Sequence, residues 1–172
     1  MSDRKLYDDF IAEVIGCGRA DNVQLEGVWT FEIKRADGSV ETHTVRNTLT
    51  SAGLNHLASC GITSVCSPFI YMAIGTQTEA SSLGSTQAGM GEVSRKACST
   101  AASSNEFIIG VATWAGAADS VTSLDLRTAG LFNHANSGSG IALNFVNSVA
   151  TILADSDFLK VQAEVRVGSH NL

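Results

Sequence analysis

The chain has 172 residues and a formal net charge of −6 at pH 7, with only 11 lysines and arginines. This length fits one domain with a core of ordinary size. Neutralising phosphates requires clustered cations, so direct binding to nucleic acid is not expected. No apolar run approaches the length that crosses a membrane, and the charged start has no apolar segment typical of a signal peptide. We therefore expect a protein that is made and folded in a cytoplasm.

Charged residues make up 16% of the chain, against about a quarter in typical domains. Two interpretations fit this low value. Neighbouring subunits in an assembly can cover part of the surface, or the chain is a β-protein built largely from small residues with neutral loops. Composition alone leaves both open.

An amphipathic helix is expected near the amino end. Six apolar residues recur at helical spacing within residues 3–15, and Gly16 and Gly18 follow as a place for the helix to end. The apolar stripe must be covered, either by the same chain or by a partner subunit. We treat residues 1–22 as a helical arm and 23–172 as the β-domain, and we take as candidate partner contacts Leu6, Tyr7, Phe10, Ile11 and Val14.

Residues 27–46 are typical of a β-hairpin, with an inward-facing alternation of Trp29, Phe31 and Ile33 and a turn at 36–38. A short helix should follow, capped by Thr50 or Ser51 and ending near Cys60-Gly61. We expect its inward residues to be Leu54, Leu57 and Ala58.

Further strands are expected along the rest of the chain, with a surface loop at 76–91 and a turn at 135–140. The last strand has the clearest pattern, because apolar and polar residues alternate through FLKVQAEVRV. This period of two indicates an antiparallel strand with one covered face. The expected strands are 69–75, 92–99, 107–114, 121–132, 141–146 and 158–167.

These elements predict a mainly β fold. The expected architecture is an antiparallel β-sandwich, jelly-roll-like, with the amino-terminal amphipathic helix and one further short helix.

The sequence contains no recognisable catalytic constellation. None of the four histidines lies in a nucleophile or metalloprotease signature, and the glycine-rich segments lack the lysine of a phosphate-binding loop. Three pairs of acids are expected to be solvated: Asp8 with Asp9, Asp119 with Asp125, and Asp155 with Asp157. We therefore predict no enzyme activity, no catalytic residues, no cofactor and no metal site.

The four cysteines show no zinc-knuckle or redox spacing. The favoured interpretation is that all four are small buried hydrophobic residues in a reducing compartment. A bridge across a short loop between Cys60 and Cys66 is the alternative.

Five segments in a fixed order resemble structural proteins of tailed bacteriophages. They correspond to a helix of the form lTnaGl..la, a strand and loop of the form yiaiGtGtt.p, an L..Ev.R segment, an AGLFn hairpin and a final alternating strand. This chain departs from the pattern at Gln77, where glycine is usual, and at Thr128, where an acid is common. The matching residues are 49–57, 71–78, 92–95, 129–133 and 158–167.

The resemblance implies a virion protein that binds without turnover. We favour a capsid decoration or cement protein, which binds and stabilises the shell of the major capsid protein. The alternative is a tail-associated connector or fibre-attachment protein. In either case we expect virion proteins as partners, a homo-oligomer that is a trimer or a dimer, assembly in the bacterial cytoplasm, and no contact with nucleic acid or membrane.

Overall fold

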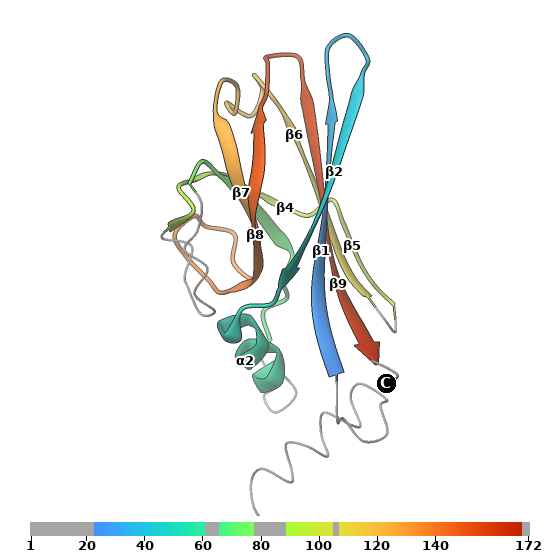
Figure 1. Cartoon of the computed structure of the whole chain (residues 1–172). Helices are drawn as coiled ribbons and strands as arrows, with labels where there is room; N and C mark the ends of the chain where they lie inside the picture. The colour runs from blue at the N-terminus through green and yellow to red at the C-terminus, as the bar shows by residue number, and fades with distance from the viewer. Residues whose placement is uncertain (1–22, 61–65, 78–88, 105–106, 170–172) are drawn as a thin grey trace, which may run out of the picture.

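The computed structural model describes residues 23–60, 66–77, 89–104 and 107–169 (Figure 1). The described residues form two antiparallel sheets and one short helix, α2 (Ser51–Cys60). The expected amino-terminal helix lies outside them. The strands are β1 (Val23–Lys34), β2 (Val40–Thr48), β3 (Tyr71–Gly75), β4 (Glu92–Ala97), β5 (Thr100–Ser104), β6 (Phe107–Ala115), β7 (Asp125–Phe132), β8 (Ala142–Ile152) and β9 (Phe158–Ser169).

One sheet has five strands in the order β2-β1-β9-β6-β5. The last strand, β9, is its central member and pairs antiparallel with both β1 and β6. Its alternating pattern is confirmed, because the apolar residues on one face are at most 1% exposed. These residues are Leu159, Val161, Ala163 and Val165.

The predicted hairpin is confirmed as β1 and β2. Trp29, Phe31 and Ile33 are fully buried on the inner face of β1. The turn closes through the Gly38 amide, which donates to the Arg35 carbonyl at 3.0 Å. Gly38 has a φ of 86°, a conformation that glycine adopts without the steric cost of a side chain.

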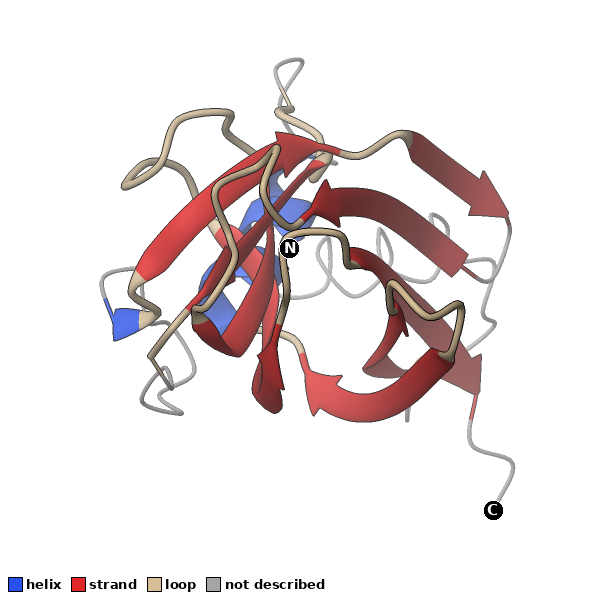
Figure 2. Ribbon diagram, turned by 90° about the horizontal axis from the view of Figure 1, so that it is seen from above, coloured by secondary structure: helices blue, strands red, loops and turns tan. Residues whose placement is uncertain are grey.

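The other sheet has four strands in the order β4-β3-β7-β8. Side chains from both sheets form one apolar core; Trp29 and Trp114 come from the five-stranded sheet, and Ile74 and Leu131 from the four-stranded sheet. Figure 2 shows the strands of both sheets curving around this shared interior. Burial between two sheets is therefore the main source of stability.

The expected strand at 92–99 is confirmed as β4, but it ends at Ala97, two residues early, because the chain then changes sheets. The Cys98 amide donates to the Ile70 carbonyl at 2.7 Å, and the next amide, of Ser99, donates to Val111 at 2.7 Å. Ile70 directly precedes β3 of the four-stranded sheet, whereas Val111 lies in β6 of the five-stranded sheet. The bend at these two residues separates β4 from β5, a strand that the sequence pattern did not predict.

Two other strand boundaries differ from those expected. β7 begins at Asp125, because residues 116–120 form turns and Ser120 and Ser123 have positive φ. β8 continues to Ile152, well beyond residue 146. The second half of β8 contains Asn147, Ser148 and Thr151 and lacks the mostly apolar composition of the first half.

The predicted helix is confirmed as α2, with Thr50 as its cap. The Thr50 hydroxyl accepts a hydrogen bond from the Gly53 amide at 2.8 Å and donates to the Ala142 carbonyl of β8. The expected inward face is wrong in part, because Leu54 is 38% exposed and Gly53 is buried. Within the described residues, no helix has the length and apolar content needed to cross a membrane.

Gly53 allows α2 to lie directly against the backbone of β8. A Cβ atom at this position would lie 2.7 Å from Leu143 Cα and 2.8 Å from the Ala142 carbonyl oxygen. These are backbone atoms of a paired strand, so they cannot move aside as the end of a flexible side chain could. Glycine is therefore required here by packing.

Gly53→Ala is expected to lower the free energy of unfolding by about 1–3 kcal/mol, the usual cost of overpacking. Helix propensity alone predicts the opposite sign, because alanine is favoured over glycine by about 1 kcal/mol. Urea denaturation followed by tryptophan fluorescence measures the change. Asn55→Ala, at an exposed position of the same helix, is the control and should be neutral or stabilising. A Gly53→Ala protein as stable as the wild type would contradict the packing argument.

Candidate interaction surface

The five residues predicted to contact a partner lie outside the described residues. Their role therefore stays a prediction from the sequence. They are Leu6, Tyr7, Phe10, Ile11 and Val14. The described residues offer a second candidate surface, which is built from the segments that carry the phage resemblance.

Three of those segments lie in neighbouring strands of the four-stranded sheet. The segment starting at Tyr71 forms β3, residues 92–95 begin β4, and residues 129–133 end β7. β3 pairs with both β4 and β7. A fourth segment, residues 49–57, includes most of α2, which lies against β8 of the same sheet. The motifs are therefore distant in sequence and adjacent in space.

A buried ion pair joins two of these motif residues. The Arg95 Nε atom donates to Glu92 Oε1 at 2.8 Å, and Arg95 Nη2 donates to Glu92 Oε2 at 2.7 Å. The two side chains are only 3% and 6% exposed. Two parallel bonds between a guanidinium and a carboxylate are strong and fix the geometry of both groups. The pair therefore places the Nη1 group of Arg95 at a defined position.

Arg95 also holds the connection between β7 and β8, residues 133–141, which we call the β7–β8 loop. Its Nη1 atom donates to the carbonyl oxygens of His134 at 2.8 Å and Ser139 at 2.9 Å. The guanidinium carbon lies 3.9 Å from the centroid of the Phe132 ring, a cation–π contact. One side chain thus fixes both ends of the loop and the aromatic residue that precedes it.

Further hydrogen bonds shape the loop from within. The Asn133 side-chain oxygen accepts from the Ile141 amide at 2.7 Å, and His134 Nδ1 accepts from the Asn136 amide at 3.1 Å. Residues 134–138, between these fixed ends, are exposed. An exposed loop on a rigid base is a common form of binding surface, because little conformational entropy is lost when a partner binds.

The outer face of the four-stranded sheet is covered as well. A second apolar cluster lies there, separate from the core between the sheets. Both faces of the central strands β3 and β7 are therefore buried, which explains why β7 is buried almost without interruption. The cluster consists of Ala73, Met90, Phe132, Ala142 and Phe145, with Tyr71 packed against it.

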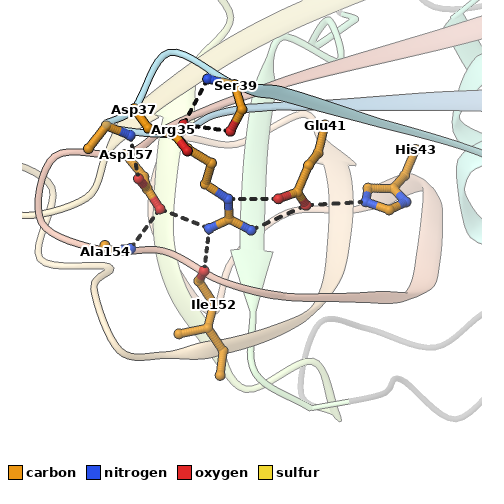
Figure 3. Close-up of polar contacts among 9 residues, drawn as sticks. Arg35, Asp37, Ser39, Glu41, His43, Ile152, Ala154 and Asp157 are labelled. Carbon is orange, nitrogen blue, oxygen red and sulfur yellow. Dashed lines mark hydrogen bonds and ion pairs between the residues drawn. The ribbon is translucent and has the colours of Figure 1, made fainter.

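A second arginine network lies at the end of the molecule that carries the β1–β2 turn (Figure 3). Arg35 Nη1 donates to Asp157 Oδ2 at 2.8 Å and to the Ile152 carbonyl at 2.9 Å. Its Nε atom donates to Glu41 Oε1 at 2.9 Å. Arg35 therefore ties the β1–β2 turn to the connection between β8 and β9.

Asp157 is the buried member of this network, with a side chain that is 3% exposed. Its carboxylate also accepts from the backbone amides of Ala154 at 2.9 Å and Ala36 at 3.2 Å. The Ala154 amide, followed by Arg35, lowers the pKa of Asp157 below its usual value. The hydrogen bond from Arg35 likewise lowers the pKa of Glu41.

The expectation that the acid pairs are solvated is wrong for two residues. Asp155 is exposed, but Asp157 is buried and accepts the hydrogen bonds described above. Asp119 accepts from the Ala115 amide at 2.6 Å and pairs with Lys96 Nζ at 2.6 Å. Its pKa is lowered, because these bonds outweigh the opposing effect of burial. The pair at residues 8 and 9 lies outside the described residues.

The cysteine prediction is also corrected. Cys60 is half-buried and Cys66 exposed, and the two form a disulfide with a Cα–Cα distance of 5.1 Å. Cys98 is a half-buried free thiol, and burial raises its pKa to about 11. Cys17 lies outside the described residues. The bridge weighed as the alternative is therefore present.

Sequence reasoning did not identify the two arginine networks. Arg35 and Asp157 are 122 residues apart, and Arg95 and Ser139 are 44 apart, so no local spacing reveals either contact. The only sequence signal for the Arg95 network was the L..Ev.R motif, in which the positions of Glu92 and Arg95 occur together.

Compared with protein-family models, with curated proteins and with solved structures, the chain gave no match.

Arg95→Lys is expected to loosen the β7–β8 loop. Lysine keeps the charge but cannot form the paired bonds to Glu92 and also reach two carbonyls. Amide hydrogen exchange at residues 134–140 should become about tenfold faster, which corresponds to a loss of about 1.4 kcal/mol in local stability. Arg127→Lys, in an exposed ion pair of β7, is the control and should leave the loop unchanged. Unaltered exchange in Arg95→Lys would show that the clamp does not hold the loop.

Asp157→Asn is expected to lower the free energy of unfolding at pH 7 by about 1.5–3 kcal/mol, because an amide replaces a charged acceptor. The folded pKa of Asp157 is depressed, so its charge stabilises the fold above the unfolded pKa, about 3.9. This contribution is lost as the pH falls towards the folded pKa. The difference from the wild type should therefore shrink below about pH 4.

Denaturant melts between pH 3 and 7 measure this difference. Asp155→Asn, at the exposed neighbouring carboxylate, is the matched control and should follow the wild type at every pH. A wild-type advantage that stays constant down to pH 3 would rule out the assigned role of the Asp157 charge.

Proposed function

We propose that this protein is a non-enzymatic structural protein of a tailed-bacteriophage virion, and that it decorates the capsid as a cement protein. In this role it binds the shell formed by the major capsid protein and stabilises it through contacts alone. Other virion proteins and further copies of the same chain are the expected partners.

The spatial convergence of the resemblance motifs is the observation that carries this proposal. Five short matches in a fixed order are individually weak, and four of them lie in or against the four-stranded sheet. Arg95 of one motif contacts Phe132 of another. Motif residues that contact one another support a structural unit in common with the phage proteins, because matches that arose by chance would not be expected to lie together in the fold.

The mechanics of the domain suit a cement role. Arg35 holds the β1–β2 turn against the connection between β8 and β9, and Arg95 holds the β7–β8 loop. This loop presents exposed small residues on a rigid base. A rigid loop loses little entropy on binding, so a modest contact area can still give useful affinity. The low content of charged side chains fits a surface that is partly covered in an assembly.

The finer description of the fold belongs to the same proposal. Two antiparallel sheets around one core support a β-sandwich. The jelly-roll connectivity, the division into an arm at 1–22 and a domain at 23–172, and the homo-oligomeric state are proposed with it.

A position in the tail is the alternative, because the same motifs occur in tail and fibre components. A connector or fibre-attachment protein would use the same loop and arm on a different partner. Copy number separates the two positions, since a shell offers many equivalent sites and a tail few.

Binding to purified, tail-less empty capsids tests the proposal. The protein should bind with on the order of hundreds of copies per capsid, because each local symmetry position repeats over the shell. Ala135→Arg places a bulky charge on the exposed β7–β8 loop and should weaken binding about tenfold or more. Ala118→Arg, in the exposed connection between β6 and β7, is the matched control and should bind normally.

Mass-spectrometric counting in complete particles provides the second measurement. A few to a few dozen copies, all lost with the tail, would support the tail position. Cleavage of a polysaccharide by the purified protein would overturn the non-enzymatic role altogether.

A further inference from the structure

Three side chains that can bind a metal ion meet at the end of α2. Among the described residues, His56, Cys60 and Cys66 bring a ring nitrogen and two sulfur atoms within 4.8 Å of one another. His56 and Cys60 are four residues apart in α2, so they share one face of the helix. Cys66 follows the helix in the chain, and its Sγ atom lies 4.0 Å from His56 Nε2.

The imidazole of His56 is held in place by three neighbours. The Phe69 ring meets it edge to face, with 5.2 Å between centroids. His56 Nε2 lies 3.0 Å from the Ser67 carbonyl oxygen and 3.4 Å from Asn133 Nδ2. One neutral tautomer donates to Ser67, and the other presents an Nε2 lone pair, the form that binds metals. The ring is therefore already oriented towards the sulfur atoms.

The disulfide between Cys60 and Cys66 occupies these sulfur atoms. A dithiol reductant can convert it to two thiols: two electrons and two protons pass to the cysteines, and the dithiol becomes a disulfide. Cys66 is exposed and Cys60 half-buried, so a small reductant can reach the bond. The two thiols would remain close, because Ser67, the neighbour of Cys66, contacts His56 through its carbonyl, and His56 shares α2 with Cys60.

We propose that reduction of the Cys60–Cys66 disulfide creates a Zn²⁺ site in which Cys60, Cys66 and His56 are the protein ligands. Two thiolates and an imidazole match the preference of zinc for sulfur and nitrogen, and water fills the fourth position. Tetrahedral zinc separates such ligand atoms by roughly 3.5–3.8 Å, close to the 4.0 Å between Cys66 Sγ and His56 Nε2.

Disulfide and zinc are then mutually exclusive states of one site. Zinc binding displaces a proton from each thiol, whereas oxidation removes the thiols themselves. The site is independent of the proposed virion role. It lies beside the base of the β7–β8 loop, because Asn133 contacts His56 through its amide nitrogen and the Ile141 amide through its oxygen.

Titration of the full-length protein with Co²⁺, a spectroscopic substitute for Zn²⁺, tests this proposal. After reduction with a phosphine in oxygen-free buffer, one equivalent of Co²⁺ should produce thiolate charge-transfer bands and the visible bands of tetrahedral cobalt. Added Zn²⁺ should remove them. The oxidised protein should show neither band. A reduced protein without these bands would overturn the proposal.

Ligand substitutions identify the site. His56→Ala, Cys60→Ser and Cys66→Ser should each weaken binding about 100-fold or more, since even changes beyond the ligands cost 10- to 100-fold. Cys98→Ser and His43→Ala should bind as the wild type. Cys66 is exposed, so its serine variant should fold normally, as an unchanged circular dichroism spectrum would show. Wild-type affinity in Cys66→Ser would overturn the assignment.

Discussion

The five-stranded sheet depends on the pairing of its last strand with two others. β9 lies between β1 and β6 and forms hydrogen-bonded ladders with both, so these two strands share a sheet only because β9 joins them. Its buried residues, from Leu159 to Val165, also face the four-stranded sheet across the common core. The sheet therefore cannot be completed before β9 is available, and its contacts are largely between residues distant in sequence. Such topologies fold slowly compared with helical domains.

The four-stranded sheet is stabilised in a different way, because its central strands, β3 and β7, are buried on both faces. On its outer face, the Glu92–Arg95 ion pair lies beside an apolar cluster. Burying such a pair costs desolvation energy, which is offset only when the geometry is good and the remaining donors are satisfied. Arg95 meets both conditions, since its remaining contacts include two loop carbonyls. The pair thus fixes the shape of the β7–β8 loop, whatever its net contribution to stability.

The proposed binding surface and the proposed zinc site are connected through Asn133, which contacts His56 on one side and closes the loop on the other. Figure 1 shows α2 and the β7–β8 loop on the same side of the molecule, away from the β1–β2 turn. Asn133 therefore joins the helix that carries Cys60 to the base of the loop. The Arg35 network, near the β1–β2 turn, is not part of this connection.

The sequence by itself determined the elements with a strong local period: the β1–β2 hairpin, the capped helix α2 and the alternating strand β9. In β1 and β9 the pattern of burial follows directly from the order of apolar and polar residues, and for α2 the sequence predicted the Thr50 cap. Only the tertiary structure decided where the chain changes sheets at Cys98, why Gly53 and not Leu54 faces β8, and why Asp157 is buried. The physical reason is that these features depend on partners far along the chain. A carboxylate looks solvated in sequence until the fold brings an arginine and two amides to it.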